Sequence, residues 1–182
     1  MHKAAYIFTM LFLMSCSSDY TPKPRGFFRI DLPKKEYQKS DLNCPFQFEY
    51  GQYAEIENRD EYCWFNLHFY NLNGTLHMSY KTIQKNLQEH IKNSHDLAYK
   101  HSRVAEGISE QPYQNKDKKI YGIVYDFEGG TASAIQFYLT DSSHHFVRGA
   151  LYFNTAINDS ITPVNDFLKA DIYHLIDSWK WK

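Results

Sequence analysis

The sequence predicts an α+β fold: a largely antiparallel sheet with helices packed on its faces, as in an α/β/α sandwich. Short segments in which apolar and polar residues alternate recur along the chain, as in half-buried strands. Residues 84–103 change to a helical period, and so does the segment that starts at Thr162. Several predicted strands carry aromatic residues on both faces, so helices are expected on both sides of the sheet.

The N-terminus has the layout of a lipoprotein export signal. Lys3 precedes an apolar stretch of about eleven residues, Ala4–Met14, which is too short to cross a bilayer as a helix. The segment Leu13-Met14-Ser15-Cys16 fits a bacterial lipobox, so residues 1–15 are predicted to be the signal peptide and Cys16 the lipidated residue. The alternative is an ordinary signal peptide with an incidental cysteine, although no A-x-A-like site precedes the polar segment.

The rest of the chain is predicted to be a tether and one domain. Residues 16–25 hold the lipidated cysteine and a polar tether with two prolines, which reaches roughly 30 Å at about 3.3 Å per residue. Residues 26–182 are predicted to form a single globular α+β domain. The 182-residue chain has a net charge of −1, without the basic excess that nucleic acid binding requires. Its 15 Tyr, 13 Phe and 3 Trp exceed what such a core would hide, which predicts an exposed aromatic surface.

Strands are predicted first in the N-terminal half of the domain. Phe46–Tyr50 alternates as a half-buried strand does, and Tyr53–Glu57 follows it. Tyr62–Tyr70 is the next strand, and the Asn73-Gly74 pair predicts a hairpin turn that leads into Thr75–Tyr80.

The strand at 62–70 has two different faces. Its odd-numbered residues are apolar and are expected in the core, whereas the even-numbered ones are aromatic and polar. Parity places His68 and His77 on this second face, whether the hairpin loop has two residues or four. If no helix covers the face, it is a candidate partner-binding surface made of Trp64, His68, Tyr70 and His77, which Tyr62 could extend.

Two cysteines remain after Cys16, namely Cys44 and Cys63. Export to an oxidising compartment favours a disulfide between them, and closing a loop of about twenty residues would contribute roughly 3 kcal/mol in the chain-entropy model. The alternative is a pair of buried free thiols.

A helix, a meander and a second helix complete the predicted fold. The helix at 84–103 is followed by strands at 119–127, 131–140 and 145–154, with turns at Gly129 and Asp141. In the last helix Thr162 is expected to be the cap and Pro163 the first helical residue. Its core face recurs at helical spacing through Val164, Phe167, Leu168, Ile172, Leu175, Ile176 and Trp179.

Four long blocks of the chain resemble the gliding motility-associated lipoprotein GldD family of Bacteroidetes. They are YTPKPRGFFRIDLP (20–33), CPFQFEYGQYAEI (44–56), CWFNLHFYNLNGTLHMSYK (63–81) and VRGALYFNT (147–155). One departure is Gly51, where such proteins are expected to have proline, and it concerns only a turn. The order of strands and helices is also similar to the α/β/α sandwich of PsbP-type proteins, a likeness of fold that implies little about function.

The resemblance implies a non-enzymatic lipoprotein, accessory to gliding motility and type IX secretion. Its partners would be the membrane, through the N-terminal lipid, and other envelope proteins of that machinery. Asp19 is the one acid close to Cys16, and without a dense acidic export tag the expected location is the periplasmic face of the outer membrane. An alternative left open is a carrier of a small envelope ligand, a lipid or cell-wall fragment, held in a pocket between sheet and helix and lined by Tyr and Trp.

Enzymatic and metal chemistry find little support in the sequence. His68 and His77 would supply two ligands, fewer than the three or four of a zinc site, and no HExxH-like spacing completes the set. Ser142, Ser143, His144 and Asp141 are the residue types of a hydrolase triad, but they are merely adjacent and no G-x-S-x-G elbow is present. We therefore expect no catalytic residues, no metal and no cofactor.

Overall fold

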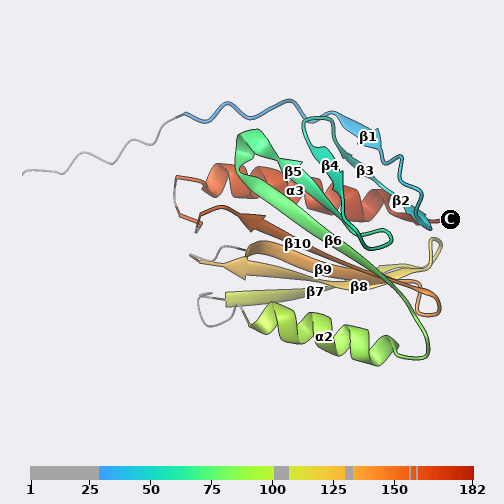
Figure 1. Cartoon of the computed structure of the whole chain (residues 1–182). Coiled ribbons are helices and arrows are strands. Elements are labelled where there is room, and N and C mark those ends of the chain that lie inside the picture. The colour runs from blue at the N-terminus through green and yellow to red at the C-terminus, as the bar shows by residue number, and fades with distance from the viewer. Residues whose placement is uncertain (1–28, 101–106, 130–132, 156, 159) are drawn as a thin grey trace, which may run out of the picture.

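An antiparallel seven-stranded sheet organises the fold, in the order β4-β5-β6-β10-β9-β8-β7 (Figure 1). The computed structural model describes residues 29–100, 107–129, 133–155, 157–158 and 160–182. The strands of the sheet are β4 (Glu55–Asn58), β5 (Phe65–Phe69), β6 (Gly74–Thr82), β7 (Gly107–Asn115), β8 (Ile120–Glu128), β9 (Ser133–Thr140) and β10 (His145–Phe153).

The sheet consists of two meanders joined at one seam. Strands β4, β5 and β6 follow one another, as do β7 to β10, and β6 pairs with β10 between them. In this seam Ser79 lies opposite Arg148 and Leu76 opposite Leu151. The pairing places residues far apart in the sequence on adjacent strands, from Thr82 opposite His145 to Gly74 opposite Phe153, which no local pattern predicts.

Two helices lie on opposite faces of the sheet, α2 (Leu87–Tyr99) on one and α3 (Thr162–Ser178) on the other (Figure 1). Ala98 of α2 belongs to a small buried cluster with Tyr125 and Phe146. Leu168 of α3 belongs to the larger core, where it lies so close to Gly74 that a Cβ there would be 2.8 Å from Leu168 Cδ1. The predicted α+β fold, an antiparallel sheet with helices on both faces, is confirmed.

Short strands add to the α3 side of the molecule. β1 (Tyr37–Lys39) pairs with β3 (Glu49–Gly51), and β2 (Phe46–Gln47) pairs with β11 (Lys180–Trp181). The single strand predicted at 46–50 is therefore split. The cause lies between β2 and β3, where the Phe48 N–H donates to Ser40 Oγ at 3.1 Å and the Phe48 carbonyl accepts from the Ser40 N–H at 2.8 Å.

Two further details differ from the sequence-based expectation. Thr162 is the first residue of α3 instead of its cap, and its Oγ1 donates to the Asn158 carbonyl at 3.1 Å. Strand β7 was not predicted because its residues are mostly exposed and polar. It is an edge strand, where Pro112 can be accommodated because one side of the strand needs no ladder hydrogen bond.

Candidate functional site

The hairpin formed by β5 and β6 positions the candidate partner-binding residues. Asn66 lies opposite His77 and His68 opposite Thr75, so Trp64, His68 and His77 share one face, as the alternation predicts. The loop runs from Tyr70 to Asn73 and is longer than a two-residue turn. Asn73 has the left-handed conformation, with φ 51°, while Gly74 is already the first residue of β6.

A hydrogen-bond network occupies the two histidines of this face. His68 contacts Glu57 Oε2 through Nε2 at 3.0 Å and Thr75 Oγ1 through Nδ1 at 3.2 Å. Asn66 donates to the same Glu57 oxygen at 2.7 Å and accepts from His77 Nδ1 at 2.8 Å. The hydrogen bonds from His68 and Asn66 lower the pKa of Glu57. The pKa of His77 is lowered by burial and by the positive charges of its neighbours, so this imidazole is neutral at neutral pH.

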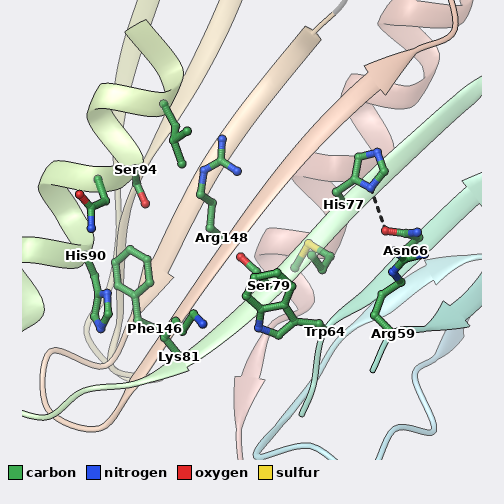
Figure 2. A pocket seen from close by; sticks show the side chains of 13 residues that line it. Arg59, Trp64, Asn66, His77, Ser79, Lys81, His90, Ser94, Phe146 and Arg148 are labelled. Atoms are coloured by element: carbon green, nitrogen blue, oxygen red, sulfur yellow. Dashed lines mark hydrogen bonds between the residues drawn. The ribbon is translucent and has the colours of Figure 1, made fainter. Parts of the chain in front are cut away.

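Beside this network, α2 leaves part of its sheet face uncovered. The resulting groove has a volume of about 520 Å³ and lies between α2 and strands β5, β6 and β10 (Figure 2). Its lining comprises Arg59, Trp64, Asn66, His77, Met78, Ser79, Lys81, His90, Asn93, Ser94, Leu97, Phe146 and Arg148.

The structure separates the four candidate residues into two pairs. Trp64 and His77 line the groove, whereas His68 and Tyr70 lie outside it. Trp64 is held in place because Nε1 donates to the Tyr80 carbonyl at 2.9 Å and Lys81 Nζ lies 4.6 Å from its ring centre. Tyr70 is 61% exposed and stacks on His68, with ring centroids 5.2 Å apart.

Arg148 is the most informative of the groove residues that sequence reasoning missed. It projects from β10 between α2 and His77 (Figure 2) and donates to Gln136 Oε1 at 2.5 Å. Burial lowers its pKa. Parity on β10 would have assigned Arg148 to the face opposite Val147 and Leu151, but only the pairing of β6 with β10 brings it next to the hairpin.

The predicted disulfide is present in the structure. Cys44 and Cys63 are bonded, with their Cα atoms 5.7 Å apart, and both belong to the main core. Cys63 directly precedes Trp64, so the bond ties the N-terminal part of the domain to the start of β5.

Other predictions concern metals, catalysis and the membrane. Within the described part of the chain, no group of three His, Cys, Asp or Glu side chains could hold a metal ion. Asp141 serves as a turn cap: burial would raise its pKa, but hydrogen bonds from the Ser143, His144 and His145 backbone N–H groups and the Ser143 hydroxyl lower it. Across the residues described, no helix is long and apolar enough to span a bilayer. Cys16 and the tether lie outside the described residues.

The fold and the groove define a class of small α+β module, in which a helix covers part of one sheet face and leaves a recess beside it. A family model described as gliding motility lipoprotein GldD matches residues 17–181, and the chain therefore belongs to this family. The resemblance noted in the sequence is confirmed. No protein of curated function matches the chain.

Family membership indicates the general function of the protein. The protein is a lipoprotein associated with gliding motility, and as a lipoprotein it is associated with a membrane of the cell envelope.

Proposed function

We propose that the protein is a non-enzymatic accessory component of gliding motility and type IX secretion that acts through contacts with other envelope proteins. The observation that carries the proposal is the exposure of two tyrosines, Tyr62 at 66% and Tyr70 at 61%. They flank the two ends of β5, with Trp64 and His68 between them. Aromatic side chains with a polar tip are enriched in protein interfaces because they supply contact area at little entropic cost.

Cys16 is the anchor in this proposal. The family is described as a lipoprotein family, and the segment Leu13-Met14-Ser15-Cys16 fits a lipobox, which together support acylation at this cysteine. Two or three acyl chains, at about 0.8 kcal/mol per buried methylene, hold a protein firmly on a membrane. An anchored domain meets its partners at a raised effective concentration, so modest contacts suffice. The periplasmic face of the outer membrane is the proposed location, because Asp19 alone makes no dense acidic export tag.

Crosslinking in intact cells, followed by affinity capture, tests the contact surface. Tyr62→Ala and Tyr70→Ala should each reduce the yield of crosslinked neighbours several-fold, because exposed side chains can be removed with little effect on folding. Tyr99→Ala is the matched control, since Tyr99 is an exposed tyrosine on α2, away from the hairpin. If both hairpin variants recover the same neighbours in wild-type amounts, the contact surface is wrong.

Detergent phase partitioning tests the anchor. The native protein should enter the detergent phase, and Cys16→Ser should move it to the aqueous phase because the acylated sulfur is gone. An acyl-free native protein recovered wholly from the aqueous phase would contradict the anchor.

A second candidate function is the binding of a small envelope ligand, and the groove favours it. Its position between the sheet and a helix is the one expected for a carrier, and about 520 Å³ lies within the usual range of ligand pockets. The lining differs from the expected one: it includes Trp64, but the described residues contribute no tyrosine to it.

A further inference from the structure

We propose that the groove beside α2 binds a small amphipathic anion, with a carboxylate or phosphate group at Arg148 and an apolar body against Trp64, Phe146 and Leu97. This inference rests on the second candidate function and names the chemical class of its ligand.

The charge of the lining is the first argument. Arg59, Lys81 and Arg148 line the groove, and among its described lining residues none is acidic. The whole chain carries a net charge of −1, so this concentration of cations is local. Arg59 and Lys81 each have an acid at the rim, Glu57 at 3.6 Å and Glu61 at 3.4 Å, but neither acid enters the lining. The described lining therefore carries cations and no acid of its own, which favours an anionic ligand.

The environment of Arg148 is the second argument. Its hydrogen-bond partners, Gln136 and Tyr152, are neutral, and no ion pair joins it to a carboxylate in the described ranges. A partly buried cation without a counter-charge is costly, and its lowered pKa reflects that burial. A guanidinium has five N–H donors in a planar fork that matches a carboxylate or phosphate. A bound anion would supply the missing charge.

Gln136 fixes the direction of the guanidinium. This glutamine is 1% exposed, and its Nε2 donates to Ser133 Oγ at 3.1 Å. Because the amide nitrogen is engaged there, Oε1 faces Arg148. Arg148 is thus held on one side by a buried acceptor, while its other side faces the groove.

The two histidines of the lining, His77 and His90, differ in what they offer a ligand. His90 Nε2 is buried and has no hydrogen-bond partner among the residues described. His77 is neutral, and its Nδ1 donates to Asn66 Oδ1. The proton of the neutral ring is therefore on Nδ1, and Nε2 is an acceptor. A ligand hydroxyl or amide can therefore donate to His77 Nε2, in addition to the anion at Arg148.

Apolar side chains form the remainder of the wall. Phe146 is buried and lies tilted against His90, with ring centroids 5.3 Å apart, and Leu97 of α2 is exposed. The indole of Trp64 forms the hairpin side. These surfaces suit a ring or a short acyl chain, so the shared chemistry is an anionic head on an apolar or ring body, from either a lipid or a cell-wall source.

Matched ligand pairs test the proposal on the full-length lipidated protein in phosphatidylcholine nanodiscs, with empty nanodiscs as the blank. Octanoate against octanol represents the lipid source, and N-acetylmuramic acid against N-acetylglucosamine the cell-wall source. Titration calorimetry gives the affinities, and the indole ¹⁵N–H signal of Trp64 reports the site. In at least one pair the acid should bind tenfold or more tightly than its neutral counterpart, and that pair identifies the source.

Arg148→Gln should remove this preference, and higher salt should weaken it. Lys81→Gln, at an exposed position that tolerates substitution, should lower the affinity about threefold if the Arg148 variant fails to fold. Arg29→Gln is the control, because Arg29 is exposed and outside the groove. Equal binding of acid and neutral ligand, or wild-type affinity in both groove variants, would overturn the anion proposal and leave the second candidate function standing. No binding of any of the four ligands would overturn both.

Discussion

The two faces of the sheet differ in whether a buried charged side chain has a partner of opposite charge. On the α3 face, Asp171 is 3% exposed and accepts hydrogen bonds from Lys35 Nζ at 2.7 Å, from the Tyr37 hydroxyl at 2.9 Å and from the Tyr53 hydroxyl. On the α2 face, Arg148 has only neutral partners in the described part of the structure.

This difference separates a structural site from a candidate binding site. The Asp171 cluster joins the N-terminal segment to α3, and its charge is neutralised by a lysine within hydrogen-bond distance. The cation at Arg148 borders a groove and still lacks a counter-charge. A buried charge that is paired with an opposite charge of the same chain stabilises the fold. A buried charge that has no such pair and lies beside a cavity is suited to binding an oppositely charged ligand.

The disulfide gives the largest expected effect on the α3 side. Replacing both Cys44 and Cys63 by Ala should lower the free energy of unfolding by about 3 kcal/mol, because the unfolded chain regains the freedom of a loop of about twenty residues. Urea denaturation of the variant against the oxidised protein measures the loss. An unchanged midpoint, with the same slope, would show that the bond contributes no stability.

Asp171→Asn should cost about 2 kcal/mol, because the amide has one oxygen where the carboxylate has two. It can accept from only one of the two tyrosines, and it no longer neutralises Lys35. Asp31→Asn is the matched control, since the Arg29–Asp31 pair is almost fully exposed and should contribute less than about 0.5 kcal/mol. Urea denaturation at neutral pH compares them. Equal losses in the two variants would mean that the cluster is no more than a surface ion pair.

Alkaline pH should weaken the same cluster. Burial, the hydrogen bond to Asp171 and the charge of Asp171 raise the pKa of Tyr37 to about 12, from an ordinary value of 10.0. The neutral hydroxyl is the form bound in the folded state, so its contribution is complete below pH 10 and is lost as the pH rises from 10 to 12. Tyr37→Phe should therefore show a shallower decline in stability over this interval, as urea denaturation at a series of pH values measures it. Identical slopes for the two proteins would contradict the prediction.

Much of the fold could be predicted because its signals are local. The alternation of β5 assigns the core residues Phe65, Leu67 and Phe69 correctly, and the helical spacing after Thr162 places Leu168 and Ile172 in the core. The disulfide between Cys44 and Cys63 was predicted because an exported protein enters an oxidising compartment and these are the two cysteines that follow Cys16.

The groove could not be predicted because it depends on long-range pairing. Trp64 and His77 belong to one hairpin and were found together, but Arg148 reaches them through the β6–β10 seam, and His90 through the path of α2 across the sheet. Strand β7 could not be predicted for a different reason. It is an exposed edge strand, and because neither of its faces is fully buried, its sequence needs no alternation of apolar and polar residues.

Replacing one cation on each face of the sheet by glutamine compares the two faces most directly, and it gives the smallest expected change in stability. Lys169 is a partly buried cation of α3 that forms an ion pair with Asp126, whereas Arg148 has no acidic partner among the described residues. Lys169→Gln should cost about 1 to 2 kcal/mol, because it leaves the Asp126 carboxylate unpaired.

Arg148→Gln should change the free energy of unfolding by less than about 1 kcal/mol, and a gain in stability is the expected sign. The shorter glutamine loses the hydrogen bond to Gln136, but the cost of burying an uncompensated charge disappears and offsets that loss. Urea denaturation without added ligand measures both variants under one set of conditions. A loss at Arg148 equal to that at Lys169 would mean that the guanidinium stabilises the fold itself. Arg148 would then be a structural residue, as Lys169 is, and its charge would not be evidence for a bound anion.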